Sequence, residues 1–152
     1  GTRYRAEALA DKVASLWGDA PDHRFVVITG GEPMLQIDDA IVEALHAQGF
    51  MIATESNGTI AAHPGIDWLC ISPKAGSNVI QRSGDELKLV WPQPGSDWQS
   101  MESWDFDHHL IQPMDVADVS LRASNIQAAI EFVQARPNWR LSLQNHKLLG
   151  LP

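Results

Sequence analysis

The sequence has one cysteine, Cys70, among its 152 residues, and it has no long apolar run. A single thiol cannot form an internal disulfide or supply the several ligands of a zinc or iron–sulfur site. Without a long apolar run, no membrane span is predicted. Basic residues are also scarce, since 11 Lys and Arg stand against 19 Asp and Glu, and the net charge of -8 disfavours nucleic-acid binding. We therefore expect a cytoplasmic protein without membrane or nucleic-acid partners.

What the chain does have is a regular alternation of apolar strands and amphipathic helices. The predicted strands span residues 25–29, 50–54, 68–71, 87–91, 109–111 and 139–143. The predicted helices span residues 6–17, 38–48 and 124–135, with a short one between 94 and 104. Strands that are apolar throughout and alternate with helices are typical of a parallel sheet covered by helices. The sequence therefore predicts an α/β fold in a single domain over residues 1–152.

The first predicted strand ends in Gly30-Gly31-Glu32-Pro33. A Gly-Gly turn after a strand often cradles a phosphate, because bare N–H groups point at the anion. Here Glu32 would repel a phosphate and Pro33 removes a donor. Exposed carbonyls beside a carboxylate suit a cation instead, such as the ammonium of an amino acid. The alternative is a tight strand-to-helix turn with an N-terminal Glu and a proline in the first turn.

Polar residues follow the C-terminal ends of nearly all the predicted strands. They are Thr29 and Glu32, Glu55 and Asn57, Ser72 and Lys74, Gln112 and Asp115, and His146. Ligands of parallel α/β proteins bind at that edge of the sheet. A binding-site rim therefore explains this pattern better than separate turns do.

Five sequence elements, in this order, resemble the 7-carboxy-7-deazaguanine synthases, which are radical S-adenosylmethionine (SAM) enzymes of queuosine and deazapurine biosynthesis. The elements are TGGEPMLQ, ESNGT, SPK, QPMD and QNHKLLGLP. The resemblance implies a partial parallel (β/α)6 barrel of the radical SAM type. It also implies a lyase that contracts 6-carboxy-5,6,7,8-tetrahydropterin to 7-carboxy-7-deazaguanine with loss of ammonia. SAM, a 4Fe–4S cluster and Mg²⁺ are the implied cofactors, with a flavodoxin-type reductant and a homodimer as implied partners.

The same resemblance implies roles for individual residues. The Gly31 carbonyl would bind the SAM ammonium, with Glu32 nearby. The rest of the implied SAM site is Ser72, Pro73, Lys74, Gln112, Pro113, Met114 and Asp115. The implied pterin site is Thr29, Glu55, His146 and the terminal carboxylate of Pro152. A carboxylate at Glu55 can accept two N–H bonds from the guanidine-like edge of the pterin.

The sequence departs from the family pattern at its start. The family's first strand carries three cysteines for the cluster, a threonine for Mg²⁺ and an arginine for substrate, and this sequence holds none of them. We therefore expect that the first strand is missing and that this chain alone is inactive. Two alternatives are another radical SAM enzyme of the glycyl-radical activase type and a non-catalytic remnant that binds a partner through an exposed sheet edge.

Three further residues carry expectations of their own. Cys70 lies mid-strand, where a buried small hydrophobe is expected. Lys88 either points into the barrel and pairs with a rim carboxylate or reaches solvent from the other face. The adjacent His108 and His109 are predicted to be a solvated pair at the start of a strand, away from the rim.

Overall fold

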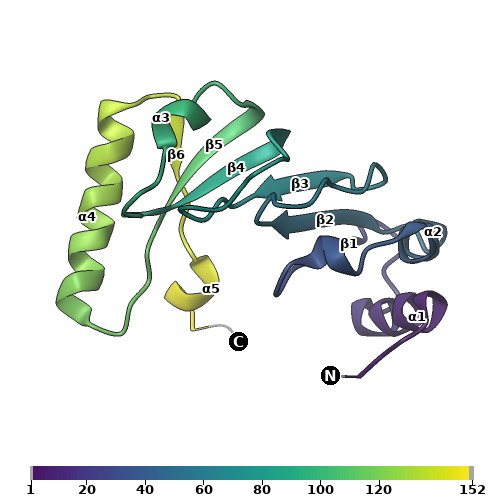
Figure 1. The fold of residues 1–152 in the computed structure, drawn as a ribbon. Coiled ribbons are helices and arrows are strands. Elements are labelled where there is room, and N and C mark those ends of the chain that lie inside the picture. Colours follow the sequence, from purple (N-terminus) through teal and green to yellow (C-terminus); the bar gives the residue numbers. More distant parts are fainter. Residues whose placement is uncertain (1, 151–152) are drawn as a thin grey trace.

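The computed structural model describes residues 2–150 and consists of a parallel sheet with helices on its outer side (Figure 1). The six strands stand in the order β1-β2-β3-β4-β5-β6, so each strand pairs with its neighbours in sequence. They are β1 (Phe25–Ile28), β2 (Met51–Ser56), β3 (Trp68–Ile71), β4 (Ser83–Trp91), β5 (Asp105–Pro113) and β6 (Trp139–Leu141). The helices are α1 (Ala6–Trp17), the 3-10 helix η1 (Pro33–Leu35), α2 (Asp39–Ala47), α3 (Trp98–Met101), α4 (Val119–Ala135) and α5 (Asn145–Leu148).

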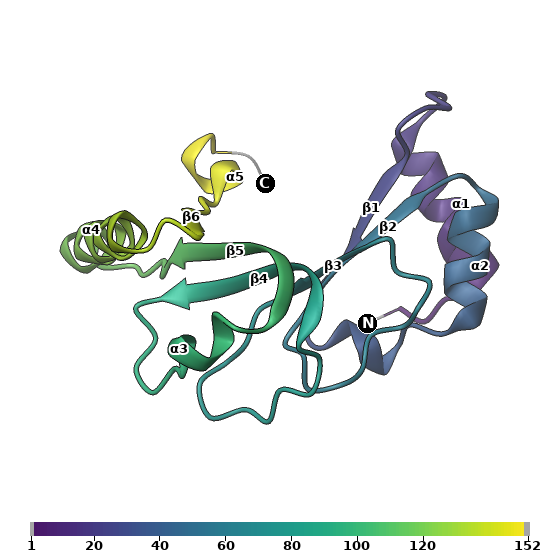
Figure 2. The ribbon, with the colours of Figure 1, turned by 90° about the horizontal axis from the view of Figure 1, so that it is seen from above.

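The sheet curves into an open partial barrel, with its two main groups of helices outside it (Figure 2). Helices α1 and α2 cover β1 and β2, and α4 covers the strands at the other end. The α1–α2 core contains Ala10, Ile41, Val42, Leu45, Phe50 and Ile52. The larger core includes Leu69, Ile71, Leu87, Leu89, Ile111, Ala129, Phe132 and Trp139. Each group of helices therefore buries its own stretch of strands on the outer face of the sheet.

Alternation along the strands separates an outer, buried face from an inner, open face. Ile52 of β2 points outward and is 0% exposed, whereas Val27 of the edge strand β1 points inward and is 54% exposed. The next inward positions along the curved sheet hold polar side chains, including Glu55 and Lys88. The inner face therefore combines an apolar edge with charged groups, which is the composition of a binding surface rather than of a core.

The α/β fold and all six predicted strands are confirmed, but some predicted boundaries are wrong. Strands β4 and β5 begin at Ser83 and Asp105, several residues earlier than predicted, because their polar first halves pair with each other in register. Helix α4 begins at Val119, since Asp118 caps it by accepting a 2.8 Å hydrogen bond from the Leu121 N–H. Helix α5 is not among the predicted helices, whereas η1 follows the Gly-Gly turn as the alternative of a strand-to-helix turn predicts.

The longer β5 also corrects the prediction for the two histidines. His108 and His109 lie in the middle of that strand and are both half-buried. The His108 ring lies 6.0 Å from the Trp68 ring on the inner face, and His109 lies 5.1 Å from Trp139 on the outer face. They are therefore packed side chains on opposite faces, not a solvated pair. Among residues 2–150, no helix is long and apolar enough to cross a membrane.

Candidate functional site

The predicted site residues lie along the C-terminal edge of the sheet. Thr29 follows β1, Glu55 lies near the end of β2, Ser72 follows β3 and Gln112 lies near the end of β5. Because all neighbouring strands are parallel, these ends lie at the same edge. The structure therefore brings together residues at the ends of four strands that the sequence placed on one rim. The binding role of each residue remains a prediction.

Glu32 fastens the Gly-Gly turn to the end of β2. Its Oε2 accepts a 2.9 Å hydrogen bond from the Asn57 N–H, and its Oε1 accepts bonds from the Ser56 hydroxyl (2.8 Å) and the Met34 N–H (3.1 Å). Glu32 thus caps η1, as the alternative of a strand-to-helix turn predicted. Gly31, with φ +33°, stays exposed beside it. Because the carboxylate points into the protein, Glu32 shapes the turn that presents the Gly31 backbone.

The turn after β3 contains one buried and one exposed polar side chain. Ser72 is 3% exposed, and its N–H donates a 2.8 Å hydrogen bond to the Ser56 carbonyl. The exposed Lys74 donates from Nζ to the Ser72 hydroxyl oxygen at 3.0 Å. Pro73 between them is buried, and its carbonyl accepts a bond from the Gln93 amide at 3.4 Å. The turn is thus anchored on both sides, and Lys74 provides a cation at the edge of the sheet.

Glu55 and Lys88 form an ion pair across the inner face. The Lys88 Nζ lies 2.6 Å from the Glu55 Oε2, and the two side chains are 14% and 37% exposed respectively. This pair confirms the alternative in which Lys88 points into the barrel. Both side chains line an inner-face pocket together with Cys70 and Glu86.

Cys70 is a buried core residue, as predicted. Burial raises the pKa of its thiol to about 12, with further upward contributions from Glu55 and Glu86 that oppose the effect of Lys88. A thiol held neutral in this way does not fit the ligand set of an iron–sulfur cluster, which needs thiolates. Within residues 2–150, no three His, Cys, Asp or Glu side chains form a group that could hold a metal ion.

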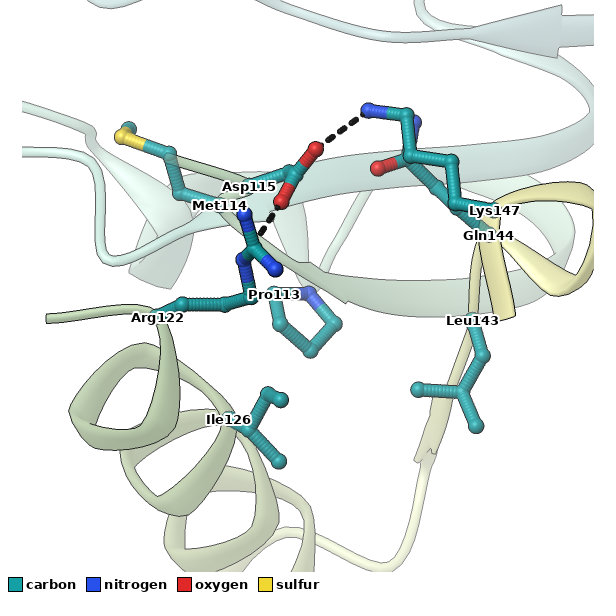
Figure 3. Close-up of a pocket in the computed structure, with 8 residues that line it drawn as sticks. All are labelled: Pro113, Met114, Asp115, Arg122, Ile126, Leu143, Gln144 and Lys147. Carbon is teal, nitrogen blue, oxygen red and sulfur yellow. Dashed lines mark hydrogen bonds and ion pairs between the residues drawn. The ribbon is translucent and has the colours of Figure 1, made fainter. Parts of the chain in front are cut away.

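At the end of β5, Asp115 joins two other elements (Figure 3). Its Oδ2 accepts a 2.5 Å hydrogen bond from the Lys147 Nζ of α5, and its Oδ1 lies 3.0 Å from the Arg122 Nε of α4. The hydrogen bond and charge of Lys147, aided by Arg122, hold the pKa of the Asp115 carboxyl below its usual value. These side chains border a cavity of about 130 Å³ lined by Pro113, Met114, Asp115, Arg122, Ile126, Leu143, Gln144 and Lys147.

The remaining predicted site residues lie at the end of β5 and in the last segment of the chain. Pro113 is buried in β5, and the Met114 carbonyl after it accepts a 2.9 Å bond from the Asn125 amide of α4. His146 lies exposed on α5, whereas Pro152 lies outside the described residues. Sequence reasoning missed Lys147 and Arg122, because nothing local in the sequence signals that they converge on Asp115.

A parallel partial barrel with polar residues at its C-terminal edge is the architecture of an α/β enzyme. Among curated proteins, the chain is 52% identical to the 7-carboxy-7-deazaguanine synthase of Caulobacter vibrioides over 147 residues, which are 97% of this chain and 69% of the relative. It is 50% identical to the enzyme of the same name from Bradyrhizobium diazoefficiens, over 99% of this chain and 71% of the relative. The chain matches no protein-family model.

The chain belongs to the 7-carboxy-7-deazaguanine synthase family. Its fold also matches the crystal structure of QueE from Escherichia coli with a TM-score of 0.69 and 26% sequence identity. That match covers 91% of this chain and 63% of the solved chain. The described fold therefore corresponds to about two thirds of the solved chain.

Proposed function

We propose that this chain is the SAM- and pterin-binding part of a 7-carboxy-7-deazaguanine synthase, which converts 6-carboxy-5,6,7,8-tetrahydropterin to 7-carboxy-7-deazaguanine with loss of ammonia. The observation that carries the proposal is that the family-like segments at the ends of β1, β2, β3 and β5 lie at one edge of the sheet, where Lys147 of the fifth segment pairs with Asp115. Identities near 50% over almost the whole chain support the same function. The named relatives favour the synthase over a glycyl-radical activase and over a non-catalytic remnant.

The SAM site lies at the ends of β1, β3 and β5. The exposed Gly31 backbone offers carbonyl oxygen to an ammonium, and Lys74 offers positive charge to a carboxylate or an N–H to a ribose. Gln112 and the segment that follows it would border the adenosine. SAM, with an electron from a 4Fe–4S cluster, would supply the radical that removes a substrate hydrogen. The residues that the structure describes do not fit the ligand set of the cluster or of Mg²⁺.

The pterin site lies on the inner side of the same edge. Thr29, just after β1, and Glu55 of β2 would contact the pterin. The Glu55 carboxylate is partly exposed and can accept two N–H donors. Exposed His146, on α5, would approach the substrate carboxylate. A flavodoxin-type reductant, a cytoplasmic location and a homodimer complete the proposal, as they do in the family that the chain resembles.

Anaerobic turnover tests this proposal. The chain, with any sequence that its gene encodes on either side, is reconstituted with iron and sulfide and incubated with SAM, Mg²⁺, reductant and 6-carboxytetrahydropterin. Mass spectrometry should detect 7-carboxy-7-deazaguanine and should find SAM regenerated rather than consumed. Cleavage of SAM without a deazapurine product would point to a different radical SAM reaction.

A further inference from the structure

Lys88 is placed unusually for a charged side chain. It projects from β4 toward β2, across the intervening strand β3, and its Nζ lies 2.6 Å from the Glu55 Oε2. Its side chain is only 14% exposed, whereas that of Glu55 is 37% exposed. A lysine side chain is rarely buried to this extent unless its ammonium is paired with an oppositely charged group. The pair is therefore asymmetric, with the cation shielded behind the carboxylate and the carboxylate facing the open side.

The side chains around Lys88 are consistent with a Glu55 carboxylate that faces the open side. Cys70 and Glu86 border the same pocket, and Cys70 stands between Glu55 and Glu86 in the register across β2, β3 and β4, with Lys88 two residues after Glu86 on β4. Among residues 2–150, the ion pair with Lys88 is the polar contact that the structure gives to the Glu55 carboxylate. Because Lys88 engages Oε2 alone, Oε1 and the remaining lone pair of Oε2 can accept hydrogen bonds.

We propose that Lys88 is the positioning residue for Glu55 in pterin recognition. Its ammonium fixes the rotamer of the Glu55 side chain, so that the carboxylate presents two acceptors to the adjacent N–H donors of a 2-amino-4-oxopyrimidine ring. Lys88 itself does not touch the ring and acts only through Glu55. This inference rests on the proposed function, since it names how one residue of that site is held. A hydrogen bond to a charged group is directional and strong enough for such orientation.

The test uses the intrinsic fluorescence of 6-carboxypterin, the oxidised form of the substrate, in titrations of the protein. Four variants are compared with the wild type: Lys88→Met, Lys88→Arg, Glu55→Gln and the Lys88→Met/Glu55→Gln double variant. Lys88→Met should weaken pterin binding by about tenfold or more, and Lys88→Arg should restore most of it because the guanidinium can still donate to Oε2. In the Glu55→Gln background, Lys88→Met should cause little additional loss.

Separate measurements distinguish orientation from a general structural effect. SAM affinity, measured by equilibrium dialysis, should stay within about twofold for Lys88→Met, since Lys88 is assigned no role toward SAM. Lys12→Met, at an exposed position of α1, is the matched control and should bind pterin normally. If Lys88→Met fails to fold, as judged by circular dichroism, Lys88→Gln is used in its place.

Four results would overturn the inference. If Lys88→Met lowers pterin affinity equally in the wild type and in the Glu55→Gln variant, then Lys88 acts independently of Glu55. An equal loss of SAM and pterin affinity would show a structural role. Wild-type protein that binds SAM but no 6-carboxypterin would overturn both this inference and the pterin part of the proposed function, whereas pterin binding that survives Lys88→Met would overturn the inference alone.

Discussion

Lys147 donates a 2.5 Å hydrogen bond to Asp115, and this contact joins the segment after the last strand to the end of β5. Arg122 of α4 approaches the other oxygen of the same carboxylate at 3.0 Å. Two cations thus converge on one anion at the predicted SAM-binding edge (Figure 3). The contact gives Asp115 a structural role, and the SAM contact that the family resemblance implies for it stays a prediction. We infer that its carboxylate holds α5, with Gln144 and His146, against the edge of the sheet.

This role predicts that Asp115→Asn loosens α5 while leaving the sheet intact. An amide cannot attract two cations, so the backbone amides of α5 should exchange with deuterium about three- to tenfold faster at pH 7. Hydrogen exchange followed by mass spectrometry measures the effect by segment. Asp19→Asn, in the exposed loop after α1, serves as the control. Unchanged exchange in α5 would show that the ion pairs do not restrain this helix.

Glu32 should contribute more to stability than a typical exposed carboxylate, because it accepts bonds from Met34, Ser56 and Asn57. Replacement by Ala should lower the free energy of unfolding by about 2–3 kcal/mol. Replacement by Gln should cost less, since the amide oxygen keeps part of the acceptor capacity. Urea unfolding gives both values, with Glu131→Gln on the exposed side of α4 as the control. A Glu32→Ala variant as stable as the control would refute the fastening role.

The carboxyl group of Asp67 should make the free energy of unfolding depend on pH in the acidic range. Burial favours a higher pKa for this carboxyl, but hydrogen bonds from the Ile52 N–H (2.7 Å) and from His46 (2.9 Å) outweigh it, so the net pKa is lowered. Its stabilising contribution is therefore complete above the unfolded-state pKa of about 4 and is lost as the pH falls through the lower folded-state value.

The comparison of wild type with Asp67→Asn measures this contribution. The variant should be less stable by about 1 kcal/mol at pH 7, since the site is partly exposed. The difference should shrink as the pH falls below about 4. Chemical unfolding as a function of pH measures it, and a difference that grows in acid would have the wrong sign for this account.

Cys70 should be inert in the folded protein. Because burial raises the pKa of its thiol to about 12, very little thiolate exists at pH 8. Ellman's reagent should therefore label the Cys70 thiol slowly in the native chain. Labelling should be complete in guanidinium at about 6 M, which unfolds most domains. Rapid labelling of the native chain would place this thiol at an accessible surface instead.

The sequence was sufficient to predict the fold and the edge of the site, because strands that are buried on the outer face appear as apolar runs. It was less informative where strands are polar. The first halves of β4 and β5 hold Asp85, Glu86, Asp105 and Asp107, so periodicity did not reveal that they pair. Pairing with a neighbouring strand, rather than local propensity, determines such segments.

The orientation of the side chains at the site could not be predicted from the sequence either. The sequence placed Glu32, Glu55 and Asp115 at one rim, and the structure confirms that placement. It could not show that Glu32 points into the protein, that Lys88 lies behind Glu55, or that Lys147 and Arg122 pair with Asp115. These contacts join residues that are far apart in the chain, and no local pattern contains them.

The most direct test of the account compares two neighbouring carboxylates on the inner face in binding 6-carboxypterin. Both stand opposite Cys70 in the register, but Glu55 lies next to the C-terminal end of β2 and pairs with Lys88, whereas Glu86 lies in the first half of β4. Fluorescence titration should show that Glu55→Gln raises the Kd for pterin by about tenfold or more, while Glu86→Gln changes it by less than about twofold. An unchanged Kd for Glu55→Gln, or an equal loss for both variants, would contradict the placement of the pterin at this edge of the sheet.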